Sequence, residues 1–229
     1  MKKKVLVIAS HPDDEVLGCG GTLIKLKKVG YKIKVIFTSD CKIRNKLGLE
    51  NFKKLNERFE LAKIVSLKLG FERPIFLKFP NLEMNRLQIT QLGQELKKII
   101  QDFKPNIIFT HYYNDIHDDH RATYESVMIS IRLKNFDFIE KVLLFETPSA
   151  TDSFYKNKIQ QFSPNVFYDI SDQIQHKLKI LKIYNEELLK YPNTRSLIGI
   201  ENLSKFRGNY LKLFNAEAFE LVWEKIIKV

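Results

Sequence analysis

Cysteine, proline and glycine are all scarce in this chain of 229 residues, which contains 2 Cys, 7 Pro and 9 Gly. Two cysteines are too few for a disulfide framework, and they indicate a reducing compartment. Neither cysteine belongs to a CxxC pair, which argues against a structural zinc site. Hydrophobic residues make up 44% of the chain, so it is not a disordered or low-complexity protein. A chain of this length buries enough surface to fold without disulfides.

Long hydrophobic runs are also missing. No stretch reaches the roughly 18 consecutive apolar residues that identify a transmembrane helix, so no membrane span is expected. The apolar run near the N-terminus, residues 5–9, is too short for the core of a signal peptide. The chain is therefore predicted to be cytoplasmic.

Acidic residues are outnumbered, with 27 Asp+Glu against 38 Lys+Arg and a formal net charge of +11. Such a charge balance is found in proteins that bind nucleic acid or an acidic membrane surface. The lysines are spread along the whole chain, however, and no block is long enough for a basic arm. We therefore expect a solvated basic surface and no nucleic-acid partner.

Strand and helix patterns alternate along the chain. Buried-strand patterns occupy residues 3–9, 32–38, 74–79, 106–110, 141–145 and 166–169. Helical patterns occupy residues 16–29, 51–69, 89–103, 122–133, 171–189 and 217–229. This alternation predicts an α/β fold, a Rossmann-like three-layer sandwich with a mostly parallel sheet. No linker or internal repeat interrupts it, so residues 1–229 are expected to form a single domain.

Four of the five histidines lie in two short polar segments, residues 10–15 and residues 111–120. Each segment directly follows a predicted buried strand. In a doubly wound sheet with the order 3-2-1-4-5, the first and fourth strands are neighbours, and ligands bind where their carboxyl ends meet. The sequence therefore predicts that these two distant segments form one site.

Imidazole and carboxylate groups together suit a borderline divalent ion, zinc above all. Two histidines and one carboxylate leave a coordination position open, as catalytic zinc sites do. The alternative is that the acidic residues 13–15 only cap the first helix, whose N-terminus favours negative charge. Capping explains one or two acids, but not three acids behind a histidine, nor the matching second segment. The pattern therefore favours a metal site.

The two segments also resemble the signatures of a known family. Residues 11–15, HPDDE, are similar to the first signature of the PIG-L/LmbE-like zinc de-N-acetylases. Residues 117–120, HDDH, resemble the second signature, commonly HPDH, with Asp118 in place of proline. Weaker similarities occur at residues 18–23, 162–171, 207–208 and 216–219. The resemblance covers most of the chain and implies the same α/β fold.

The resemblance implies that His11, Asp14 and His120 hold one metal ion per chain, Zn²⁺ or else Fe²⁺. It implies that Asp13 is the general base that takes a proton from a zinc-bound water. Glu15 is expected at the start of the helix or behind the ligands rather than on the metal.

The resemblance further implies that His117 stabilises the oxyanion or protonates the leaving amine, and that Asp119 tunes His117. The implied activity is zinc-dependent removal of an N-acetyl group from an N-acetylglucosamine-type sugar or sugar conjugate. Two alternatives stay open. One is a zinc amidase that cleaves another acyl amide, such as a thiol conjugate or acylated antibiotic. The other is a non-catalytic protein that binds an anionic partner.

Five further residues are candidates for contacting the substrate, namely Arg58, Arg44, His111, Asp115 and Asn81. Alternatively, Arg58 forms a surface salt bridge, His111 ends its strand by hydrogen bonding, and Asp115 orients an imidazole. The expected partner is a small N-acetylated amino sugar, and the basic surface suits an anionic one. Relatives are often homo-oligomeric, which leaves a homo-oligomer open for this chain.

Overall fold

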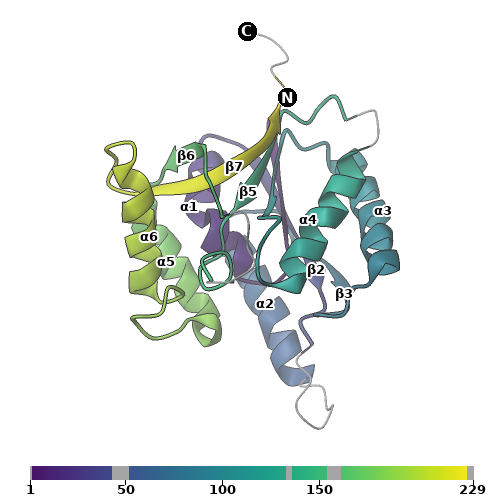
Figure 1. Ribbon diagram of the computed structural model, residues 1–229, viewed down its shortest axis with the longest axis horizontal. Helices are drawn as coiled ribbons and strands as arrows, with labels where there is room; N and C mark the ends of the chain where they lie inside the picture. The colour runs from purple at the N-terminus through teal and green to yellow at the C-terminus, as the bar shows by residue number, and fades with distance from the viewer. Residues whose placement is uncertain (1, 43–51, 133–135, 154–160, 226–229) are drawn as a thin grey trace.

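The computed structural model describes residues 2–42, 52–132, 136–153 and 161–225, except for the side chains of residues 52–55. Within these residues, seven strands form one sheet with the order β3-β2-β1-β4-β5-β7-β6 (Figure 1). The strands are β1 (Lys4–Ala9), β2 (Lys32–Ser39), β3 (Ile75–Phe79), β4 (Ile107–His111), β5 (Lys141–Phe145), β6 (Val166–Asp169) and β7 (Ala216–Glu224). The first five are parallel to one another, and β7 runs antiparallel to both β5 and β6.

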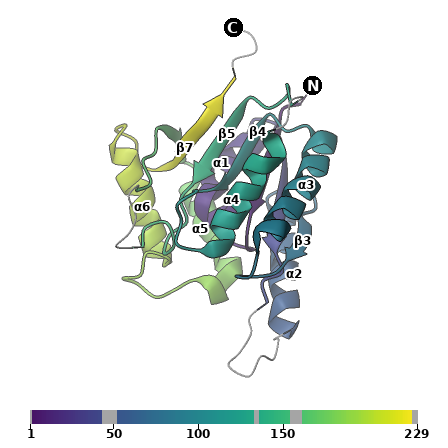
Figure 2. The same ribbon diagram turned by 45° about the vertical axis from the view of Figure 1, so that its right-hand side comes forward.

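Helices cover both faces of this sheet (Figure 2). They are α1 (Asp14–Lys28), α2 (Phe52–Lys68), α3 (Arg86–Phe103), α4 (Asp118–Ile131), α5 (Ile174–Leu181) and α6 (Leu197–Asn209), with the short 3₁₀ helix η1 (Lys182–Glu187) after α5. Successive side chains of β1 point to opposite faces of the sheet. Val5 and Val7 pack with α1, α2, α5 and α6, while Leu6 and Ile8 pack with α3 and α4. The predicted three-layer, mostly parallel α/β fold is confirmed.

The C-terminal third departs from the sequence prediction. The segment predicted as a last helix, residues 217–229, is the strand β7 over its described part. This segment contributes apolar side chains to both faces of the sheet. Phe219 and Leu221 pack with the α1 side, and Trp223 packs with the α3 side. Pairing with two neighbouring strands outweighs the weak helical pattern.

The helix predicted over residues 171–189 is shorter than expected. Regular α5 ends at Leu181, and Tyr184 has non-helical backbone angles within η1. The sequence pattern did not predict α6, which begins after Ser196, whose side chain accepts a hydrogen bond from Gly199 N. Among the described residues, no helix is long and apolar enough to cross a membrane.

Candidate active site

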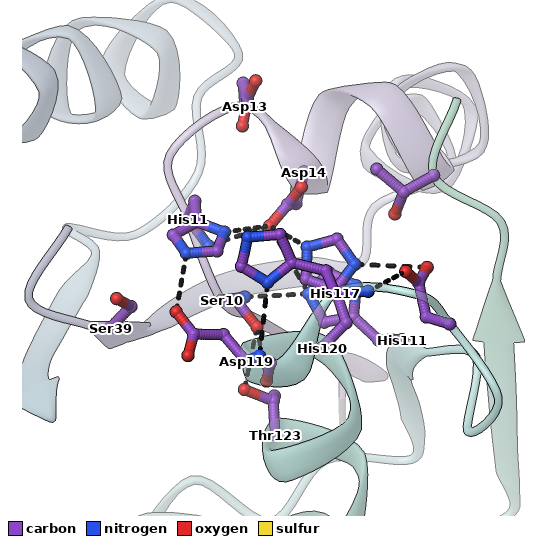
Figure 3. Close-up of polar contacts among 12 residues, drawn as sticks. Ser10, His11, Asp13, Asp14, Ser39, His111, His117, Asp119, His120 and Thr123 are labelled. Atoms are coloured by element: carbon purple, nitrogen blue, oxygen red, sulfur yellow. Dashed lines mark hydrogen bonds and ion pairs between the residues drawn. The ribbon is translucent and has the colours of Figure 1, made fainter. Parts of the chain in front are cut away.

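The two polar segments meet at one edge of the sheet. Strands β1 and β4 are parallel neighbours, with Ile8 paired to Thr110, so both chains leave the sheet at the same edge. Just beyond, the Ser10 N–H donates to His111 Nε2 at 2.9 Å, and Ser10 Oγ donates to the carbonyl of Asp119 at 3.0 Å (Figure 3). The convergence that the strand order predicts is therefore present.

Three buried side chains of these segments could hold a metal ion. His11, Asp14 and His120 each offer one ligand atom, and these atoms lie within 4.8 Å of one another. Asp14 Oδ2 is 3.3 Å from His11 Nδ1 and 3.4 Å from His120 Nε2. Asp14 Oδ1 is buried and has no hydrogen-bond partner among the described residues. A buried carboxylate oxygen without a partner is costly, and a cation on this donor set satisfies it.

The second nitrogen of each of these histidines faces another carboxylate. His11 Nε2 lies 2.9 Å from Asp119 Oδ2, and His120 Nδ1 lies 3.2 Å from Asp115 Oδ2. A carboxylate behind a histidine fixes the ring orientation and makes the other nitrogen a better metal ligand. The donor set and its supports therefore fit a divalent ion such as zinc.

The carboxylate of Asp119 lies beside both His11 and His117. It contacts His11, and its other oxygen accepts a hydrogen bond from Leu82 N at 2.7 Å. The backbone N–H of Asp119 donates to His117 Nδ1 at 3.2 Å. The Asp119 carboxylate also acts to raise the pKa of His117, although burial and the neighbouring His120 outweigh it. Tuning of His117 by Asp119 stays a prediction, and the structure adds a contact between Asp119 and a candidate metal ligand.

The imidazoles and carboxylates of this centre shift one another's pKa values. Burial acts against the charged form of His11 and His120, but nearby carboxylates outweigh it and raise their pKa values to about 9 and about 10. Burial likewise opposes ionisation of Asp14, yet His120 and His111 hold the pKa of Asp14 well below its usual range. The carboxylates therefore favour positive charge at the positions where a cation would bind.

His111 and His117 lie beside the ligand set. His111 is fully buried, and its ring stacks on His120 with 3.8 Å between centroids. Because its Nε2 accepts from a backbone N–H, its placement fits the strand-end alternative. His117 is only partly buried, and burial together with the neighbouring His120 lowers its pKa to about 4.

Asp13 occupies an unusual place at the start of α1. Figure 3 shows Asp14 pointing into the histidine cluster and Asp13 lying to one side of it. The backbone φ of Asp13 is 121°, in the left-handed half of conformational space that residues other than glycine rarely adopt. Such strain is typical of functional positions. Burial raises the pKa of its carboxyl to about 6, although the guanidinium of Arg195 opposes the shift.

Other predicted contact residues have defined positions. Asn81 Oδ1 lies 3.1 Å from His11 Nε2, and Asp115 supports His120 and also accepts a hydrogen bond from Thr151. Arg58 forms a half-buried ion pair with Glu187 at 3.1 Å. Arg44 lies outside the described residues.

The sequence prediction missed two residues that contact this region. Arg195, in the loop before α6, pairs with the Asp13 carboxylate across 182 positions of the chain. Tyr184 of η1 donates its hydroxyl to Glu15 at 2.8 Å. A cleft of about 460 Å³ opens between α2 and η1, lined in part by Arg58, Tyr184 and Glu187. A single arginine in a polar loop carries no sequence signal of such a contact.

Comparison with known proteins identifies the family of this chain. The family model described as "PIG-L: GlcNAc-PI de-N-acetylase" matches residues 6–131, more than half of the chain. The chain belongs to this family. All three candidate metal ligands of this PIG-L family member lie within the matched residues.

Relatives of this PIG-L chain carry deacetylase names. It is 29% identical over 178 residues to the uncharacterized deacetylase YaiS of Escherichia coli, covering 75% of this chain and 84% of YaiS. It is 27% identical to the diacetylchitobiose deacetylase of Thermococcus kodakarensis, covering 81% of this chain and 70% of that protein. Its fold matches N,N'-diacetylchitobiose deacetylase from Pyrococcus horikoshii with a TM-score of 0.76 and 21% identity, over 96% of this chain and 84% of that one.

Proposed function

We propose that this chain is a zinc-dependent hydrolase that removes the N-acetyl group from an N-acetylglucosamine-type sugar or sugar conjugate. The observation that carries the proposal is the buried set of His11, Asp14 and His120, with the strained Asp13 beside it and an Asp14 oxygen that has no hydrogen-bond partner in the part of the chain that the structure describes. The deacetylase names of the relatives support the choice of reaction.

His11, Asp14 and His120 would hold the ion. Zinc bound by two imidazoles and one carboxylate acts as a Lewis acid, acidifying water and polarising an amide carbonyl. Asp119 and Asp115 would keep the two imidazoles in the ligating orientation, because each faces the nitrogen that does not point at Asp14.

Asp13 would act as the general base. Its Oδ1 is buried without a hydrogen-bond partner in the described part of the chain, so one oxygen is available to accept a proton from the attacking water. Because Asp13 and Asp14 point in different directions, one carboxylate can serve the ion while the other handles the proton.

His117 would stabilise the oxyanion that forms before the amine leaves. Since its Nδ1 accepts from the Asp119 N–H, the ring proton of the neutral imidazole belongs on Nε2. That N–H can donate to the oxyanion that develops as water adds to the amide carbon. The amine leaves after gaining the proton that Asp13 took from water, and the products are acetate and a free amino sugar.

Acetate release tests the proposal. The zinc-loaded chain is incubated with N-acetylglucosamine, diacetylchitobiose and an N-acetylglucosaminide carrying a carboxylate or phosphate. We expect acetate from at least one of them, loss of the activity with a chelator, and recovery on adding zinc. The +11 charge favours the anionic compound at low salt. Absence of acetate from every compound, with zinc bound, would refute the proposal.

Two alternatives give different results. A zinc amidase for another acyl group would leave these three compounds intact and would release an amine without acetate only from an amide that carries that acyl group. A non-catalytic binder of anions would release no amine from any amide and would bind the anionic compound equally well after Asp13 or His117 is replaced. Adding amides with other acyl groups and a binding measurement therefore separates all three.

A further inference from the structure

Asp13 needs support from outside its own motif. Its side chain is 1% exposed, and a buried carboxylate without a partner is strongly unfavourable. Its backbone has a φ of 121°, which the local sequence does not favour. The position and direction of this carboxylate therefore depend on contacts made by other parts of the chain.

One contact holds the backbone of Asp13. Its N–H donates to Glu15 Oε2 at 2.9 Å, and Tyr184 donates to the other oxygen of Glu15 at 2.8 Å. These bonds fix the unusual backbone angles but leave the Asp13 carboxylate free to rotate. A second contact must set its direction.

Arg195 makes that second contact. Its Nη2 donates to Asp13 Oδ2, while Asp13 Oδ1 stays without a hydrogen-bond partner among the residues described. The guanidinium thus occupies one oxygen of the carboxylate and leaves the other for a reacting proton. A planar guanidinium suits this task, because its donors have a fixed geometry.

The loop that carries Arg195 is held by contacts of its own backbone. The Arg195 N–H donates to Asn193 Oδ1 at 2.8 Å, and the Arg195 carbonyl accepts from Leu189 N at 3.2 Å. The loop also lies close to the first turn of α6, where a Cβ on Gly199 would be 2.6 Å from the Thr194 carbonyl oxygen. Glycine at this position permits the close approach of the loop to α6.

We propose that Arg195 is a positioning residue that directs the Asp13 carboxylate, so that Oδ1 is the oxygen that accepts the proton. The inference rests on the proposed function, in which Asp13 is the base. Arg195 acts on the reaction through Asp13 and not through the substrate. Its removal should therefore lower kcat and leave both KM and bound zinc unchanged.

Steady-state acetate release by zinc-loaded variants tests this. Arg195→Ala should lower kcat about 10–100-fold, as is typical for supporting residues of metal sites, with KM unchanged. Arg195→Lys should recover part of kcat, because it keeps a cation near Asp13. Lys190→Ala is the matched control, since it removes an exposed cation from the same loop and should behave as wild type. Zinc content and thermal melting establish that each variant is folded and loaded.

A double variant separates positioning from substrate binding. If Arg195 acts through Asp13, then Arg195→Ala should change kcat about 2-fold at most when Asp13→Asn is already present. A higher KM for Arg195→Ala, or an equal loss of rate in the Asp13→Asn background, would mean that Arg195 contacts substrate and would overturn the inference. So would an Arg195→Ala enzyme as fast as wild type. Wild-type chain that releases no acetate would instead refute the proposed function.

Discussion

A buried ion pair lies inside the α1 face of the sheet, and the loss of one of its partners should be strongly destabilising. Lys177 of α5 and Glu217 of β7 are 3% and 5% exposed, with 2.7 Å between Nζ and Oε1. The Glu217 carboxylate accepts from the backbone N–H groups of Gly21 and Thr22 in the middle of α1, at 2.8 and 2.7 Å. Lys177 also donates to the Leu17 carbonyl at 2.8 Å. The pair therefore joins α5 and β7 to the helix that begins at Asp13 and Asp14.

Replacing Lys177 by Met keeps the side-chain length but leaves the Glu217 carboxylate buried without its cation. Breaking a buried pair by removing one partner costs about 3–5 kcal/mol of unfolding free energy. For a chain of this size, each kcal/mol corresponds to about 2–4 °C in Tm, so Lys177→Met should lower Tm by about 6–20 °C. Thermal unfolding followed by circular dichroism measures this shift.

An exposed pair in the same protein provides the control. Lys205 and Glu201 of α6 lie 2.8 Å apart, with side chains that are 52% and 30% exposed. Lys205→Met should therefore cost about 0–1 kcal/mol. The double variant Lys177→Met with Glu217→Gln should lose less than the sum of its single variants, because the second change removes the unpaired charge. If Lys177→Met melts like Lys205→Met, the buried pair does not stabilise α1 and the reasoning is wrong.

Three further variants test the roles of the site residues, each in the zinc-loaded enzyme or in a metal titration. Asp13→Asn should retain zinc and lose about 10²–10⁴-fold in kcat, as expected for a general base; a parallel loss of zinc would make Asp13 a ligand. His120→Ala should instead lose zinc, which metal analysis after dialysis measures, and retention of the full amount would remove it from the ligand set. Asp119→Asn should weaken zinc binding about 10–100-fold by freeing His11. Unchanged zinc affinity with a lower kcat would show that Asp119 acts on His117 instead.

The sequence predicted the meeting of the two polar segments because that meeting follows from general rules. Apolar runs ending at polar turns identify β1 and β4, and a doubly wound sheet makes them neighbours. Residue chemistry then favoured a metal site, since imidazole and carboxylate groups are rarely collected in such short segments. Local pattern and topology were enough to predict where the site lies, whereas the choice of His11, Asp14 and His120 as ligands came from the family resemblance.

Contacts between distant segments could not be predicted in the same way. Strand β7 forms because two strands offer it hydrogen bonds, and neither of them is adjacent to it in sequence. Arg195 and Tyr184 reach the site through contacts with Asp13 and Glu15, which lie 182 and 169 positions away in the chain. The contact between His11 and Asp119 likewise joins side chains 108 positions apart, and no spacing rule encodes it.

The candidate ligands and the groups that support Asp13 lie in different parts of the chain. The candidate ligands and Asp13 all lie within residues 6–131, the part that the PIG-L family model matches. The groups that hold Asp13 and α1 come from residues beyond it, because Tyr184 supports Glu15, Arg195 pairs with Asp13, and Glu217 binds the amides of α1. Changes in the C-terminal third should therefore alter the rate or stability while the ligand set remains complete. A metal-binding measurement alone would not detect such changes, whereas kcat and Tm would.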